Sequence, residues 1–201
     1  MKWLTPILPY LAVGIGLFWF HSAWTALLGF HFAIVISLLL ARSKIPVKIL
    51  FQNNSIRWAI LSIFLSSSSG GSLYLLWKFF GVTDALPVQL ETLGLTKSTW
   101  PGFIAYFVFV NPFVEEYFWR GFLGDPTKRL FISDFLYAGF HALVLIGKVR
   151  TGSIIFSLVV LILAGWFWRQ IAREDQGLFA PVLGHMAADF TILLAVYRIT
   201  I

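Results

Sequence analysis

Long apolar stretches dominate the chain and alternate with short polar segments. The apolar stretches are residues 3–20, 23–41, 57–80, 101–123, 131–147, 152–169 and 178–197. Their lengths are near the ~20 residues of helix that cross the hydrocarbon core of a bilayer. They run unbroken, and lipid favours helices because a helix satisfies its own backbone hydrogen bonds. The pattern therefore predicts an all-α, polytopic transmembrane helix bundle of about seven spans, with six or eight also compatible.

The polar segments predict where the chain leaves the membrane. The longest, 81–100, contains Gly, Pro and charged residues and is expected at a membrane surface. The run SSSSGGS at 66–72 is linker-like in composition, but small residues inside an apolar stretch also permit close helix packing, which we favour. The first stretch lacks a small-residue cleavage site, so we interpret it as a retained span and not as a signal peptide. Without an internal repeat, residues 1–201 are predicted to form a single transmembrane domain.

Composition and charge narrow the class of protein. The chain is 59% hydrophobic and only 12% charged, whereas soluble domains average about 25% charged residues. Its net charge of +6 is not gathered into a basic cluster interleaved with aromatics, so nucleic acid is not an expected partner. The absence of cysteine excludes disulfides and thiolate chemistry. The expected partner is membrane lipid, and the expected location is a prokaryotic cytoplasmic membrane, with an organelle membrane left open.

Lys and Arg counts predict the orientation of the bundle. With the N-terminus inside, nine of these cations lie on the cytoplasmic side and five on the other, which follows the positive-inside rule. The cytoplasmic group is Lys2, Arg42, Lys44, Lys48, Arg57, Lys128, Arg129, Arg169 and Arg173.

Ionisable residues deep inside the apolar stretches are the main functional candidates. Each charge at the middle of a bilayer costs roughly 3 kcal/mol on insertion scales, so such residues usually face a bundle interior and serve a function. At ~1.5 Å of rise per residue, Glu115, His141 and His185 lie roughly 10–15 Å from the same membrane face. Three helices can therefore bring a carboxylate and two imidazoles to one level.

Residue spacing refines this cluster. Glu116 and Arg120 are four residues apart, with the acid first, which suits a helical ion pair. Glu115 points about 100° away around a helix and is left without a local cation, which makes it the candidate general base for water. His185 and Asp189 share a helix face by the same four-residue spacing.

Structural interpretations of the same residues stay open. The ion pair could serve only to specify the fold, His141 could be a satisfied core histidine, and His185 with Asp189 could be a packing hydrogen bond. A hydroxyl from Tyr137, four residues before His141, could orient that ring. The joint occurrence of the three elements at one level favours a functional site. His31, like the interfacial His21, has no partner at a matching depth, and both are interpreted as structural.

Three motifs in this region resemble those of a known family. EEYFWRG at 115–121 is similar to its Glu-Glu-x-x-x-Arg motif, YAGFH at 137–141 to its Phe-x-x-x-His motif, and HMAAD at 185–189 to its His-x-x-x-Asn/Asp motif. The family is the CPBP intramembrane proteases, which include CAAX prenyl protease 2 and the bacteriocin-processing, Abi-type proteins. The resemblance covers about residues 100–197, which would be the catalytic core.

The resemblance implies a bundle with a water-accessible cavity and hydrolysis of a peptide bond. In the implied mechanism Glu115 activates water with help from His141, while His185 and Asp189 stabilise the oxyanion. An ionised Asp189 would repel an oxyanion, so it must be protonated or act by orienting His185. The implied site comprises Glu115, Glu116, Arg120, His141, His185 and Asp189. Glu116 and Arg120 would support the site.

Cofactor, substrate and alternative functions are also constrained. Glu115, His141 and His185 could form a three-ligand zinc site, but no HExxH motif presets two ligands on one helix face. We therefore favour a reaction without a cofactor and leave zinc open. The expected substrate is a membrane-associated peptide or protein, lipidated or membrane-anchored. The alternatives are a non-catalytic scaffold or immunity protein, an ion-coupled carrier, and a haem protein.

Overall fold

The computed structural model describes residues 2–52 and 55–201, and this part of the chain is helical. Its elements are η1 Lys2–Leu4, α1 Ile7–Phe18, α2 Ala23–Leu40, η2 Val47–Phe51, α3 Ile56–Leu75, α4 Leu86–Thr92, α5 Trp100–Phe109, α6 Asn111–Glu116, η3 Tyr117–Phe122, α7 Ile132–Gly139, α8 His141–Leu145, α9 Thr151–Asp175 and α10 Phe179–Thr200. The one strand-like pairing among the described residues is an isolated bridge between Val82 and Val149. The predicted all-α helix bundle is confirmed.

Each predicted apolar stretch falls on helix, with shifted ends. α3 ends at Leu75 and not near residue 80, and α9 continues to Asp175, beyond the predicted end at 169. Within the described ranges, α2, α9 and α10 are each long and apolar enough to cross a membrane. The number of spans stays a prediction.

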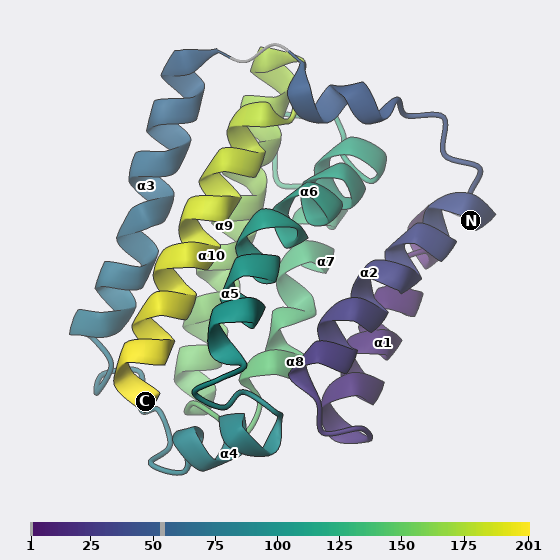
Figure 1. The fold of residues 1–201 in the computed structure, drawn as a ribbon. Coiled ribbons are helices and arrows are strands. Elements are labelled where there is room, and N and C mark those ends of the chain that lie inside the picture. The colour runs from purple at the N-terminus through teal and green to yellow at the C-terminus, as the bar shows by residue number, and fades with distance from the viewer. Residues whose placement is uncertain (1, 53–54) are drawn as a thin grey trace.

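The helices form two groups that meet at α6, η3 and the α7–α8 pair (Figure 1). α3, α9 and α10 stand side by side, with α5 against α10, while α1 and α2 pack as a hairpin on the other side. α4, the α1–α2 connection and the C-terminus gather at one end of the bundle, and the α2–α3 and α9–α10 connections lie at the other. This division agrees with the predicted placement of the loops on two membrane faces.

Apolar side chains cover the outside of the bundle, and polar ones lie within it. Large exposed hydrophobic residues include Leu11, Phe32, Leu39, Phe64, Phe109, Phe156 and Leu163. Buried polar and charged residues include His31, Asn111, Glu115, Glu116, Arg120, Asp134, Arg169 and His185. Helices that are apolar on their outer faces suit a lipid surrounding, so the interior is where this chain places its polar chemistry.

Small residues allow α3 and α10 to pack closely. Ser62, Ser66 and Gly70 are buried on one face of α3. A Cβ added at Gly70 would lie 2.6 Å from Thr191 Cβ and closer still to that residue's backbone. A Cβ added at Gly184 of α10 would likewise clash with the side chain of Ser62, whose Cβ would lie 2.9 Å away. The predicted packing role of the SSSSGGS run is therefore confirmed, because α3 continues through it without a break.

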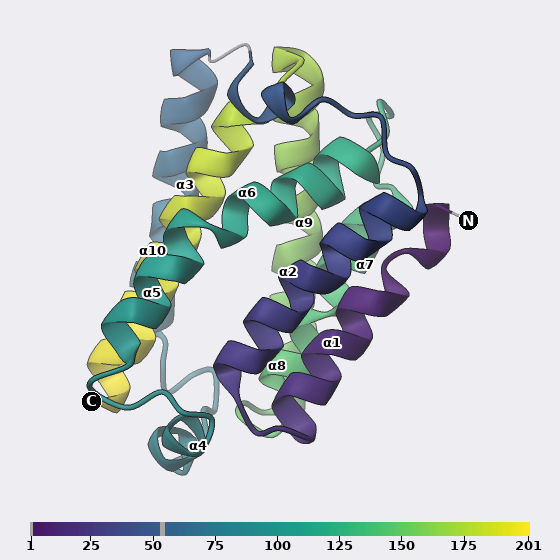
Figure 2. The ribbon, with the colours of Figure 1, turned by 45° about the vertical axis from the view of Figure 1, so that its right-hand side comes forward.

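A break between α5 and α6 redirects the chain at the site. Pro112 lacks an N–H and its ring crowds the carbonyl one turn earlier, which interrupts the helix near Val110. Figure 2 shows α6 turning away from the direction of α5 and running toward α2. A π-helical turn, Tyr117–Phe122, follows directly, with Leu123 N–H donating to the Phe118 carbonyl at 2.8 Å. Such turns often occur at functional sites.

Tyr10 of α1 shapes the break between α7 and α8. Its hydroxyl donates to the Leu136 carbonyl at 2.6 Å and interacts with the backbone N–H of Phe140. These two backbone groups would otherwise bond to each other in a continuous helix. An inserted side chain is a known cause of helix kinks, and here the kink falls just before His141.

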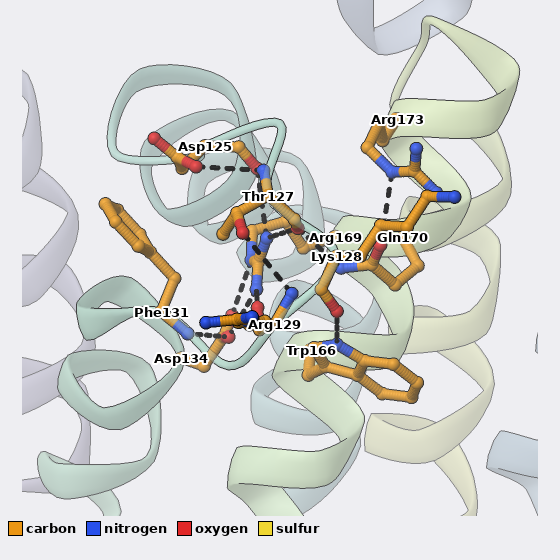
Figure 3. Close-up of polar contacts among 10 residues, drawn as sticks. All are labelled: Asp125, Thr127, Lys128, Arg129, Phe131, Asp134, Trp166, Arg169, Gln170 and Arg173. Atoms are coloured by element: carbon orange, nitrogen blue, oxygen red, sulfur yellow. Dashed lines mark hydrogen bonds and ion pairs between the residues drawn. The ribbon is translucent and has the colours of Figure 1, made fainter.

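Arg169 organises the loop between η3 and α7 (Figure 3). Its guanidinium donates to both carboxylate oxygens of Asp134, at 3.0 and 2.8 Å. It also donates to the backbone carbonyls of Asp125, Thr127 and Arg129, at 3.0, 2.6 and 2.6 Å. Arg169 was counted among the cations that predict orientation, but it is buried and paired, so it contributes less to that asymmetry than a loop cation would.

Candidate active site

Glu116 lies at the centre of the site. Its Oε1 is 3.1 Å from Arg120 Nη1 and 2.8 Å from His185 Nδ1. The Glu116–Arg120 ion pair predicted from the spacing is therefore present, and its second partner, His185, was not predicted. The side chains of Glu116 and Arg120 are both buried. The Arg120 guanidinium lies 3.9 Å from the centre of the Tyr137 ring, within the range of a cation–π interaction.

His185 lies between two carboxylates. Its Nδ1 faces Glu116, and its Nε2 is 3.6 Å from Asp189 Oδ1, which is beyond hydrogen-bond length. Trp168 of α9 stacks on the imidazole with ring centroids 4.9 Å apart and donates its Nε1–H to Ser62 Oγ at 3.1 Å. The ring is thus fixed by charge at its edges and by an aromatic plane on its face.

Glu115 is buried beside this pair, at 2% exposure. It lies within electrostatic range of His185, Asp189 and Arg120 and interacts with the side chain of Asn111. Its Oε2 has no hydrogen-bond partner among the described residues. A buried carboxylate oxygen without a partner is costly, and such groups are typical of sites that bind a polar ligand.

His141 completes the predicted cluster at its edge. Its Nδ1 is 3.0 Å from the backbone carbonyl of Tyr137, and a carbonyl only accepts, so Nδ1 carries the proton and Nε2 the lone pair. The expectation that the Tyr137 hydroxyl would orient this ring is wrong, because the backbone does so. His141 is half-buried and lies within electrostatic range of His185 and Arg120.

Asn111 and His31 join the site and were not predicted to do so. Asn111 Nδ2 donates to Asp189 Oδ2 at 3.2 Å, and its Oδ1 is 3.0 Å from His31 Nε2. The His31 Nδ1 is in turn 3.1 Å from the hydroxyl of Tyr106. The interpretation of His31 as lacking a partner at a matching depth is therefore wrong. His21 is exposed with a φ of 45° and lies outside the cluster.

Signals for these missed residues differ in strength. Asn111 precedes Glu115 by four residues, so helical spacing could have placed both on one face. The sequence offers no comparable signal for His31 or Trp168, because their approach to the site depends on how α2 and α9 pack.

The arrangement of the donor groups bears on whether the cluster could hold a metal ion. The part of the chain that the structure describes contains no group of three or more His, Cys, Asp or Glu side chains arranged to hold one. His185 directs one nitrogen at Glu116 and the other toward Asp189, and His141 directs one at the backbone. Glu115, His141 and His185, the residues that could form a zinc site, do not make up such a group among the described residues. A hydrogen bond at the Nδ1 atom of a histidine is itself compatible with a metal at Nε2.

One family model matches the segment that contains most of this cluster. Residues 97–191, just under half of the chain, match the model of a family of intramembrane endopeptidases. The description of that family is Rce1-like, type II CAAX prenyl endopeptidase. No curated protein and no solved structure matches the chain. The matched segment contains all three motifs, and the resemblance recognised from them is confirmed.

Proposed function

We propose that the chain hydrolyses a peptide bond in a membrane-associated protein or peptide, with a prenylated CAAX protein as the first substrate class to test. The observation that carries the proposal is the buried cluster in which Glu115 lies beside the Glu116–His185 contact. The family match supports a peptide or protein substrate. The proposed catalytic core is residues 100–197, within a single domain that extends to the N-terminus.

The proposed reaction begins at Glu115. Its carboxylate takes a proton from water, and the resulting hydroxide attacks the carbonyl carbon of the scissile bond. His141, with its Nε2 lone pair, accepts a hydrogen bond from the same water and orients it. The carbonyl electron pair moves to oxygen, where the oxyanion accepts a hydrogen bond from His185 Nε2–H.

Collapse of the tetrahedral intermediate completes the reaction. The carbonyl re-forms, the C–N bond breaks, and the leaving nitrogen takes the proton held by Glu115, which gives a carboxylic acid and an amine. The Glu116–Arg120 pair supports the site by holding His185 Nδ1 through Glu116 Oε1. We propose that no resident metal takes part, because the reaction can be written with Glu115, His141 and His185 alone.

Replacement of the proposed base tests this function. Wild-type protein in lipid vesicles is expected to cleave a quenched farnesylated peptide ending in a CAAX sequence, or an unprenylated peptide with a membrane anchor. Glu115→Gln should lower kcat/KM by about 10²–10⁴, as expected for loss of a general base. Glu91→Gln makes the same change on the exposed face of α4 and should leave the rate unchanged. Full activity of folded Glu115→Gln would contradict the proposal.

Metal content of the same preparations tests the proposed absence of a metal. Wild-type, Glu115→Gln and His185→Ala proteins should all contain no stoichiometric zinc, and wild type should keep its activity after chelation. One zinc per chain that is lost in both variants would instead make Glu115 a ligand.

A further inference from the structure

We propose that His31 and Asn111 are positioning residues that hold Asp189 as a carboxylate turned toward His185. The inference rests on the proposed peptidase function and adds two residues to its machinery. His31 lies on α2, outside the segment that matches the family model. The chain of contacts runs from α5 and α2 through α6 to α10.

The hydrogen bonds of His31 and Asn111 are costly to lose because both side chains are buried. His31 is 7% exposed and Asn111 is 1% exposed, so neither can replace a lost hydrogen bond with bulk water at no cost. Tyr106 packs on His31 with ring centroids 5.6 Å apart. The ring is thereby fixed in the plane that brings its Nε2 to the amide of Asn111.

The orientation of the Asn111 amide sets the direction of the other hydrogen bonds in this chain of contacts. Asn111 donates from its NH₂ group to Asp189 Oδ2, so its carbonyl oxygen faces His31. That oxygen only accepts, so the proton of His31 is on Nε2. His31 Nδ1 then carries a lone pair and accepts from the hydroxyl of Tyr106. The far end of the chain is a donor aimed at Asp189, which matches an ionised carboxylate.

This direction resolves how an acid can serve at position 189. The family motif that HMAAD resembles allows Asn or Asp, and an asparagine could donate to an oxyanion directly. An ionised Asp189 cannot, but with Oδ2 held by Asn111 its Oδ1 faces His185 Nε2 at 3.6 Å. At that distance the attraction orients the ring while Nε2–H is free to donate to the substrate oxyanion.

Loss of the His31 donor would undo this arrangement. Without it the Asn111 amide can rotate and present its oxygen to Asp189, and two facing acceptors repel each other. Asp189 must then take up a proton or turn aside, and His185 loses one of the two carboxylates that orient it. With Asn at position 189 either amide orientation can be satisfied, so His31 matters less.

Nitrogen NMR tests the positioning without any substrate. The chain has four histidines, so ¹⁵N-histidine spectra of the detergent-solubilised protein can be assigned by single substitutions. We expect the Nε2–H tautomer at His31 and a shift of the His185 nitrogens in His31→Phe. A His31 proton on Nδ1, or unchanged His185 signals in a folded His31→Phe protein, would overturn the inference.

Kinetics in a double-mutant cycle test its role in turnover. His31→Phe should lower kcat by about tenfold with little change in KM, and His31→Gln, which restores a donor, should recover most of the loss. In an Asp189→Asn background the same His31→Phe change should cost less than about twofold. His21→Asn, at an exposed histidine with positive φ, is the matched control and should be silent.

The outcomes separate this inference from the proposed function. Equal losses from His31→Phe in both backgrounds would show a general structural role and reject positioning through Asp189. If folded wild-type protein cleaves neither peptide probe, the proposed function fails, and the NMR result alone decides whether His31 orients Asp189.

Discussion

Arg169 shows how one buried cation can hold a loop. It is 2% exposed, and five hydrogen bonds link it to Asp134 and to three backbone carbonyls of residues 125–129. The planar guanidinium fits this set because it offers donors in a fixed fork, which lysine does not. The loop that follows the π-helical turn is therefore attached to α9 mainly through Arg169, beside Trp166 and Gln170, which donate to the carbonyls of Lys128 and Thr127.

Removal of that cation should destabilise the protein strongly. Arg169→Leu leaves the Asp134 carboxylate buried without its partner, which should cost about 3–5 kcal/mol and expose residues 125–130 to proteolysis. Arg173→Leu is the control, because Arg173 pairs with the half-exposed Glu174 and exposed pairs contribute about 0–1 kcal/mol. Thermal unfolding in detergent and limited proteolysis measure both. Equal stability of the two variants would contradict this account of the loop.

At the residue scale, the sequence predicted the site's charged groups but not what surrounds them. Glu115, Glu116 and His185 were identified because a charge inside an apolar stretch is costly wherever it lies. His31 is equally polar, but its role depends on the approach of α2 to α6. Spacing along one helix could not reveal a partner that tertiary packing supplies.

The α3–α10 contact shows the same dependence on packing at the scale of elements. Gly70 and Gly71 are neighbours in α3. A Cβ added at Gly70 would clash with Thr191, whereas a Cβ added at Gly71 would have no such neighbour within 4 Å. Composition alone could not separate the two glycines. The helical structure places one toward α10 and the other outward.

A pair of alanine substitutions tests this contact. Gly70→Ala should push α3 from α10 and destabilise the protein by about 1–3 kcal/mol, as overpacking does. Gly71→Ala should be neutral or should stabilise by about 0.5–1 kcal/mol, because alanine favours helix. Unfolding temperatures of the two variants in the same detergent measure the difference. A Gly70→Ala protein as stable as Gly71→Ala would show that the helices are not in close contact here.

The broken helices were beyond the reach of the hydropathy pattern. The stretches 101–123 and 131–147 were expected as continuous spans, but each contains a break at the site. Pro112 gave a local signal for the first break. The second depends on the hydroxyl of Tyr10 at Leu136, a contact between residues 126 positions apart, and hydropathy carries no information about such contacts.

At the scale of the whole molecule, the arrangement of the loops makes orientation measurable. The chain lacks cysteine, so single cysteines report on one position each. Lys128 lies in the loop after η3, and Lys97 lies before α5, and both are exposed. We propose that Lys128 faces the cytoplasm and that Lys97 faces the opposite side, as the Lys and Arg counts favour.

Cysteine labelling in intact cells tests this orientation. A membrane-impermeant maleimide should label Lys97→Cys in intact cells and Lys128→Cys only after permeabilisation. Cysteine-free wild type gives the background signal. The reverse pattern would place the N-terminus outside, and labelling of both positions in intact cells would contradict the division of the loops between two faces.

Synthesis order has a consequence for when the site can act. His185 and Asp189 lie on α10, which follows all the other described helices, whereas Tyr10 and His31 lie on the first two α-helices. A growing chain therefore contains Glu115 and Glu116 before His185 has been translated. The proposed site stays incomplete until residue 189 has been added, so segments of the chain that are synthesised earlier meet a site that cannot yet cleave them.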